Sequence, residues 1–134
     1  MVAALTLDGI SKRYGGFQAV SDLSFQVEKG SICGFLGPNG AGKTSTLRMI
    51  LGLQPATSGR IDILGAPDGR LVRDRIGFLP EERGLYKKMK VMDQLIFLGQ
   101  LHGLDAATAS KRSYEWCERL GIMASIGKKT EQLS

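Results

Sequence analysis

The sequence predicts an α/β fold that has an antiparallel β part at its N-terminus and a helical part after it. Residues 1–80 contain several segments in which apolar and polar residues alternate, as in half-buried strands, with one helical pattern among them. From Val91 to about Leu120 the apolar residues instead recur every three or four positions, as they do in helices. We therefore divide the chain into residues 1–80 and residues 81–134.

The bulk properties are those of a globular protein. The chain has 134 residues and a formal net charge of +5, which is long enough for one domain with a core. No run reaches the roughly 18 apolar residues of a membrane-spanning helix. The start has no secretory signal, so we expect a cytoplasmic protein. Cys33 and Cys117 fit no metal motif, and we expect both thiols to be reduced and structural.

Strands are expected in the first part wherever the alternation holds: Leu5–Tyr14, Phe17–Val20, Leu23–Val27 and Gly59–Leu64. The run Ser31–Leu36 is nearly continuously apolar, which is typical of a strand buried on both faces. Arg75–Leu79 is expected to be a further short strand. A helix is expected over Lys43–Leu53, where Gly52 and Pro55 end the pattern.

Two further helices are expected after the polar loop 80–90. The first begins at Val91 and ends near His102. Either Asp105 or Thr108 caps the second helix, which runs to about Leu120.

A phosphate-binding motif lies between the apolar run and the first helix. Residues Gly37–Thr44 read GPNGAGKT and match G-x-x-x-x-G-K-[ST], the P-loop, in the strand-to-helix position that a P-loop requires. Its glycines let the backbone N–H groups turn inward and form a nest for phosphate oxygens. The positive end of the following helix adds to this field. The motif predicts binding of a nucleoside triphosphate with Mg²⁺.

Each position of the loop has an expected role. Lys43 reaches the β- and γ-phosphates and is the candidate catalytic residue. The hydroxyl of Thr44 is a ligand for Mg²⁺, and Ser45 donates to a phosphate. The remaining cofactor-binding positions lie in the cradle itself: Gly37, Asn39, Gly40, Ala41 and Gly42.

Hydrolysis needs two further groups, a carboxylate for Mg²⁺ at the end of an apolar strand and a group that orients water. After residue 50 no run of four apolar residues is followed by Asp. The single histidine, His102, falls at a predicted helix end. The sequence therefore contains half of an ATPase site.

The run around the loop resembles the ATP-binding subunit of ABC transporters, and within that family the sodium- and drug-exporter branch. The segments that carry the resemblance are GPNGAGKTS at Gly37–Ser45, LQPATSGRI at Leu53–Ile61, and IGFLPE at Ile76–Glu81 with EERGLY at Glu81–Tyr86. Leu133–Ser134 looks like the first two residues of the family's LSGGQ signature. The resemblance therefore covers the whole chain but only about the N-terminal half of a family domain, which makes this an incomplete domain of the P-loop NTPase class.

The resemblance adds two site residues. Tyr14 lies 23 residues before Gly37, where the family has an aromatic residue that stacks on adenine, so ATP is the expected nucleotide. Glu81 stands where the family has Gln, and we expect it to sense the nucleotide and to ligate Mg²⁺. The chain alone is expected to bind ATP weakly and to turn it over negligibly.

The resemblance also implies partners. The family member works as a dimer of two ATPase copies with a membrane-spanning permease, at the inner face of the membrane. Two alternatives stay open: a soluble ABC-type ATPase acting on nucleic acid or the ribosome, and a complete short module whose missing half comes from another chain. Because later strands of the family sheet lie beyond these residues, we expect an exposed sheet edge or apolar face.

A basic run bears on the first alternative. Residues 70–90 carry seven basic and three acidic side chains, with no set of aromatic residues that could stack on bases. We interpret this run as a solvated or protein-facing surface, and no nucleic acid is expected as a partner.

Overall fold

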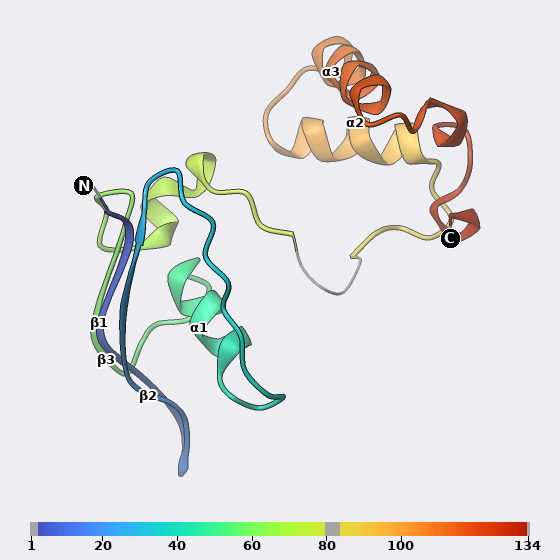
Figure 1. Cartoon of the computed structure of the whole chain (residues 1–134). Coiled ribbons are helices and arrows are strands. Elements are labelled where there is room, and N and C mark those ends of the chain that lie inside the picture. Colours follow the sequence, from blue (N-terminus) through green and yellow to red (C-terminus); the bar gives the residue numbers. More distant parts are fainter. Residues whose placement is uncertain (1–2, 80–83, 134) are drawn as a thin grey trace. The chain divides into compact units, whose positions relative to one another are not determined.

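The computed structural model describes residues 3–79 and 84–133. The chain forms two compact units, an N-terminal unit, Met1–Phe78, and a C-terminal unit, Leu79–Ser134. The first contains an antiparallel sheet with a helix and the second is helical (Figure 1), which confirms the predicted fold class. The boundary predicted between residues 80 and 81 lies outside the described residues. Within the described residues, no helix combines the length and apolar character needed to cross a bilayer.

The sheet of the N-terminal unit has three strands in the order β2-β1-β3. Its strands are β1 (Ala3–Tyr14), β2 (Phe17–Glu28) and β3 (Ser58–Ile63). The two short strands predicted over residues 17–27 are one strand, because the pairing of β2 with β1 continues through an irregularity at Asp22. This residue has φ 45°, and its N–H donates to Ser11 Oγ at 3.0 Å, which replaces a ladder hydrogen bond.

Helix α1 (Lys43–Ile50) covers one face of this sheet. The core between them consists of Leu7, Ile10, Val20, Met49, Ile50, Ile63 and Val72. Val72 comes from a 3-10 helix, η1 (Gly69–Arg75), which the sequence pattern did not predict. Helix α1 ends before the predicted Leu53, because Leu51 is its C-cap and Gly52 turns the chain with φ 67°.

The predictions of strands at Ser31–Leu36 and Arg75–Leu79 were wrong. Ser31–Leu36 pairs with no strand among the described residues, and its Ile32 and Leu36 are 102% and 91% exposed. In the second segment, η1 extends to Arg75 and unpaired chain follows. A strand buried on both faces needs hydrogen-bonded neighbours and a cover on each side, which the three-stranded sheet of the described residues does not provide.

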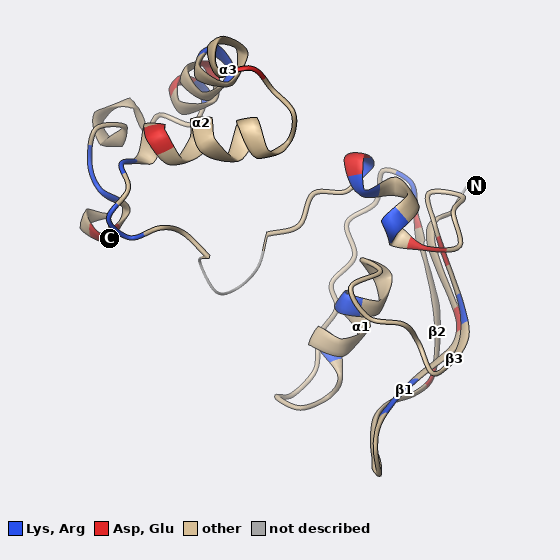
Figure 2. Cartoon of the chain, turned by 180° about the vertical axis from the view of Figure 1, so that it is seen from behind, with Lys and Arg blue, Asp and Glu red and all other residues tan. Residues whose placement is uncertain are grey.

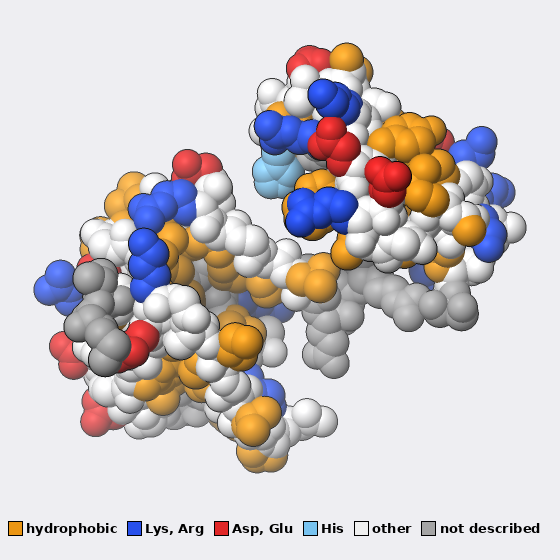
Figure 3. All heavy atoms as spheres, turned by 45° about the horizontal axis from the view of Figure 1, so that its top comes forward, with side chains coloured by type: hydrophobic (Ala, Val, Ile, Leu, Met, Phe, Trp, Pro, Cys, Tyr) orange, Lys and Arg blue, Asp and Glu red, His pale blue; other side chains and the backbone are white. Residues whose placement is uncertain are grey.

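The prediction of an exposed apolar face is confirmed by the same segments. Leu36 and Leu79 are almost fully exposed, and hydrophobic side chains are visible across the N-terminal unit in Figure 3. Cys33 is exposed with its neighbours, so the expectation that it is a structural thiol was wrong, whereas Cys117 is buried as expected.

The C-terminal unit is built on α2 (Val91–Leu101) and α3 (Ala106–Arg119), followed by two 3-10 turns, η2 (Met123–Ser125) and η3 (Thr130–Gln132). Helices α2 and α3 approach closely at Gly99, where a Cβ would lie 3.0 Å from the Cβ of Ala109. Of the two predicted caps, Asp105 is the N-cap of α3, and it accepts from the Thr108 N–H at 2.9 Å and from the Thr108 hydroxyl at 2.5 Å. These hydrogen bonds to the ionised carboxylate lower the pKa of Asp105.

A buried amide holds the loop before α2. Gln94 is 4% exposed, and its Oε1 accepts a hydrogen bond from the Tyr86 N–H at 2.6 Å. The carbonyl of Tyr86 in turn accepts from the Thr130 hydroxyl at 2.7 Å. The segment that follows the undescribed residues 80–83 is thereby tied both to α2 and to η3.

We predict that Gln94→Leu destabilises the C-terminal unit by roughly 1–3 kcal/mol, because it leaves the Tyr86 N–H without its acceptor. The matched control is Gln100→Leu, the same change at an exposed position of the same helix, which is expected to change stability by less than roughly 0.5 kcal/mol. Urea unfolding followed through the fluorescence of Trp116, the single tryptophan, measures both variants. Equal effects of the two substitutions would contradict the role given to Gln94.

Candidate phosphate-binding site

The predicted P-loop connects the unpaired segment after β2 to the first turn of α1. Gly40 and Gly42 both have left-handed backbones, with φ of 83° and 85°, and Gly42 is the N-cap of α1. Ala41 N–H donates to the Pro38 carbonyl at 3.2 Å, which closes the turn. The first N–H groups of an α-helix have no partners inside the helix, so those of α1 are of the kind that can donate to an anion.

The sheet constrains the end of this loop. A Cβ added to Gly42 would lie 2.3 Å from the Ala19 carbonyl oxygen and 2.9 Å from Val20 Cγ2, both of which belong to β2. Only glycine fits at this distance, and only glycine adopts the left-handed backbone there without strain. The start of α1 is therefore held directly against β2, an edge strand of the antiparallel sheet.

The ammonium group of Lys43 folds back over the loop. Its Nζ donates to the carbonyl of Gly37 at 2.6 Å and to that of Pro38 at 2.7 Å. These carbonyls are weaker acceptors than phosphate oxygens, because a charge on both partners strengthens a hydrogen bond. The lysine thus stands where it can exchange its bonds to the loop for bonds to a triphosphate.

The other predicted loop residues surround this lysine. Asn39 and Ala41 are exposed, as is Thr44, whose hydroxyl lies in the first turn of α1. Ser45 is half-buried, and Thr46 after it is fully buried in the core. The two residues that carry the proposed ligand oxygens are therefore on the open side of the helix start.

The structure brings Tyr14 to the same helix. Its Oη lies 3.4 Å from Ser45 Oγ and donates a hydrogen bond to Gln54 Oε1. The Lys12 ammonium lies 5.1 Å from the centre of the Tyr14 ring, as in a cation–π contact. The ring stays 42% exposed, so an aromatic surface remains accessible beside the P-loop helix.

Several contacts of the site had no signal in the sequence. Gln54 contacts Tyr14, and the Ala19 carbonyl lies against Gly42, but both pairs are far apart in the chain and belong to no motif. Lys12 lies two residues before Tyr14, but no motif marks its contact with the ring. Glu81, the remaining predicted site residue, lies outside the described residues.

A separate cleft of about 400 Å³ lies at the other end of α1. The cleft runs between the turn after α1, β3 and η1, and none of the predicted site residues lines it. Its lining residues are Met49, Gly52, Leu53, Gln54, Pro55, Ala56, Gly59, Ile61, Pro67, Asp68 and Arg70. Arg70 donates to the Asp68 carboxylate at 2.5 Å, which lowers the pKa of Asp68.

Comparison with known proteins shows the family to which the chain is similar. The family model described as ABC transporter matches residues 20–134. The chain is 46% identical over 130 residues to the ABC transporter ATP-binding protein YhaQ of Bacillus subtilis (strain 168), covering 97% of this chain and 44% of that protein. It is 38% identical over 133 residues to the linearmycin resistance ATP-binding protein LnrL of the same organism, covering 97% and 43%.

A solved structure has the same fold. The chain superposes with a TM-score of 0.84 and 24% identity on cbiO1 from Clostridium perfringens, a part of the ABC transporter complex cbiONQ, over 100% of this chain and 57% of that one. The chain spans about half the length of the curated relatives that it matches.

We predict that Gly42→Ala destabilises the N-terminal unit by well over 1 kcal/mol and abolishes binding of a fluorescent ATP analogue, because the new Cβ collides with Ala19. Gly15→Ala is the control, since Gly15 also has a positive φ (56°) but has nothing within 4 Å of an added Cβ. It is expected to lose only the roughly 1 kcal/mol of left-handed strain. Urea unfolding followed by circular dichroism and a titration with the analogue separate the two; equal stability losses would refute the collision.

Proposed function

The chain belongs to the ABC transporter family, and from this we propose that it is the part of an ATP-binding subunit that holds ATP while the subunit energises transport across a membrane. One observation carries the proposal. The Lys43 ammonium donates to two carbonyls of the glycine-rich loop, and Tyr14 lies beside the helix that begins there. This combines a cradle for phosphates with a platform for a base.

The residues fit a triphosphate with its metal. The left-handed turns at Gly40 and Gly42 curve the backbone of the loop. A Cβ on Gly37 would lie 3.3 Å from the Ala41 Cβ and 3.8 Å from Lys43 Cδ, so a glycine there leaves room beside the lysine, which supplies the positive charge. We propose that Thr44 holds Mg²⁺ through its hydroxyl and that Ser45 donates to a phosphate. Bound Mg²⁺ would neutralise charge on the phosphate oxygens.

Adenine would stack on the exposed part of the Tyr14 ring. The Oη bonds to Gln54 and the contact with Lys12 fix the orientation of this ring before a nucleotide arrives. A ring that is already fixed loses little conformational freedom on binding, which favours the stacked complex.

We further propose that residues 1–134 alone hydrolyse ATP negligibly. Lys43 and Thr44 would bind phosphate and metal, but hydrolysis also needs a carboxylate for Mg²⁺ at the end of an apolar strand and a group that orients water. No segment after residue 50 has the apolar strand followed by Asp that would supply the first of these. Glu81 is proposed as a nucleotide-sensing residue that ligates Mg²⁺.

The proposed partners are a second copy of the ATPase subunit and a membrane-spanning permease, and the proposed location is the cytoplasmic face of the membrane. Relatives described as ABC transporter and drug-resistance ATP-binding proteins support this role, and the daunorubicin resistance protein DrrA3 of Streptomyces coeruleorubidus favours export. A soluble ATPase acting on nucleic acid has no comparable support from these relatives.

We predict that Lys43→Ala weakens binding of Mg·ATP by roughly tenfold or more, because it removes a charge-assisted contact to the β- and γ-phosphates. Lys29→Ala, which removes the same charge from an exposed turn after β2, is the control and should leave affinity unchanged. Isothermal titration calorimetry measures both. The unsubstituted chain should release negligible phosphate in the same buffer, and a turnover rate comparable to that of an intact ATPase, lost in Lys43→Ala, would overturn the proposal.

We predict that Tyr14→Ala weakens ATP binding by several-fold, since an aromatic stack contributes roughly 0.5–1.5 kcal/mol. Tyr14→Phe keeps the ring and removes the Oη bonds to Gln54 and Ser45, so it should retain most of the affinity. Titration of both variants with ATP and with inorganic triphosphate tests the stacking role. A loss in Tyr14→Ala that is equal for the two ligands would assign Tyr14 to loop structure instead.

A further inference from the structure

Two short segments of the C-terminal unit gather five lysines. The lysine patch consists of Lys87, Lys88, Lys90, Lys128 and Lys129, and all five side chains are exposed. The first three precede α2 and the other two precede η3, so about 40 residues of sequence separate the two groups. Figure 2 shows the two basic segments beside each other next to the C-terminus.

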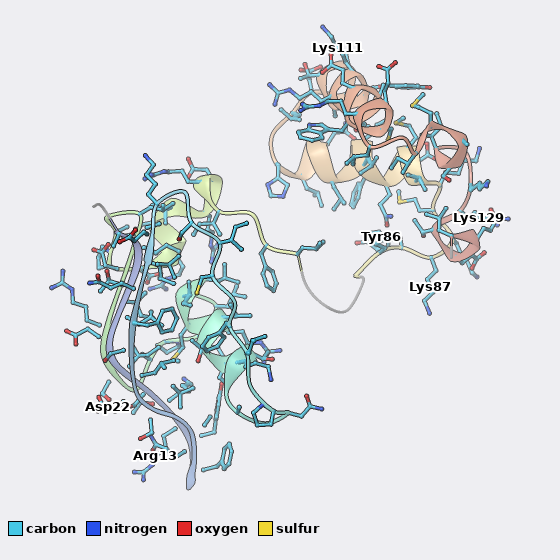
Figure 4. The ribbon with its side chains drawn as sticks, viewed as in Figure 1. Arg13, Asp22, Tyr86, Lys87, Lys111 and Lys129 are labelled. Atoms are coloured by element: carbon cyan, nitrogen blue, oxygen red, sulfur yellow. The ribbon has the colours of Figure 1, made fainter. Side chains whose placement is uncertain are left out.

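The backbone holds the patch together. Lys90 and Lys129 form an antiparallel bridge, and the Val91 N–H donates to the Lys128 carbonyl at 3.0 Å. On the other side of the bridge, the Glu131 N–H donates to the Lys87 carbonyl at 3.0 Å. The lysine side chains take no part in these bonds and are free to extend outward, as Lys87 and Lys129 do in Figure 4.

The charge of the patch is poorly compensated. Residues 84–90 contain no acidic side chain, residues 128–133 contain one, Glu131, and the first turn of α2 adds the exposed Asp93, so two carboxylates accompany five lysines. In the part of the chain that the structure describes, the single ion pair joins Arg70 to Asp68 and belongs to the other unit. Like charges held close together repel one another, so the patch has an unmet attraction for an anionic surface.

Apolar side chains stand next to the lysines. Leu85 is 46% exposed and Tyr86 is 58% exposed, and the Tyr86 ring rests edge-on against Phe97 with the ring centres 5.8 Å apart. Lysines beside an exposed leucine and an anchored tyrosine are the composition of surfaces that lie at a membrane interface. Single-stranded nucleic acid instead needs a row of aromatic platforms, and Tyr86 is one ring.

We propose that the lysine patch docks on anionic phospholipid headgroups at the membrane surface. This goes beyond ATP binding, because it assigns the C-terminal unit a direct contact with lipid in addition to a protein partner. The contact is independent of the P-loop, so it can be tested without nucleotide and can fail or succeed separately from the proposed function.

The test is co-sedimentation of the full chain with vesicles of phosphatidylcholine, with and without phosphatidylglycerol. The chain should bind only the vesicles that contain phosphatidylglycerol, and added salt should release it. The double variant Lys87→Gln/Lys129→Gln should bind roughly twenty-five-fold more weakly, since each lysine near such a surface contributes roughly fivefold.

The matched control is Lys111→Gln/Arg112→Gln, which removes the same net charge from exposed positions of α3, away from the patch in Figure 4. It should bind nearly as tightly as the unsubstituted chain. Glu131→Gln should strengthen binding several-fold, because it removes the one acidic side chain of the two segments. Unchanged Trp116 fluorescence and circular dichroism show that each variant is folded.

Three results would overturn the proposal: no binding of the unsubstituted chain to anionic vesicles, equal losses in the two double variants, or displacement from vesicles by a single-stranded RNA whose own binding depends on Lys87 and Lys129. The last result would assign the patch to nucleic acid.

Discussion

The close approach of Gly42 to the Ala19 carbonyl is the constraint on which the candidate site depends. At that distance no side chain fits, so the N-cap of α1 must be a glycine and the helix must start against β2. The same contact fixes the direction of α1, which places Met49 and Ile50 in the core and leaves Thr44 on the open side. The backbone of the predicted phosphate-binding loop and the packing of the core thus depend on the same contact.

The N-terminal unit contains a paired antiparallel sheet and, after it, a segment that pairs with no strand among the described residues. The antiparallel sheet has its three strands, its register and its packed face, all within residues 3–72. Residues 31–36, which lead into the P-loop, pair with no strand among the described residues. Their Ile32 and Leu36 are exposed to solvent, although the apolar pattern is typical of an interior strand. The relatives are roughly twice as long as this chain.

These differences explain what the sequence could and could not predict. The P-loop motif, the alternation in β1 and the start of α3 near Asp105 are local, and a local pattern is enough to predict each of them. The choice of Asp105 over Thr108 as the cap needed the structure. Whether Ser31–Leu36 forms a strand depends on neighbouring strands, and the described residues contain none that pair with it. The apolar pattern alone indicates only that such a strand would need cover on both faces. The contacts of Tyr14 with Gln54 and of Gly42 with Ala19 were beyond prediction because they join distant residues of unremarkable type.

In the C-terminal unit, the grouping of charged residues likewise depends on contacts between segments that are distant in the sequence. Along the sequence, residues 70–90 are one basic run, but the structure divides it, with Arg70, Arg73 and Arg75 on η1 and the lysines in the other unit. The lysines instead gain Lys128 and Lys129 as neighbours through the bridge at Lys90. Because backbone hydrogen bonds hold this cluster, each side chain can be replaced without loss of the fold. Its exposed charge is therefore better explained by what it meets outside the chain than by a role in stability.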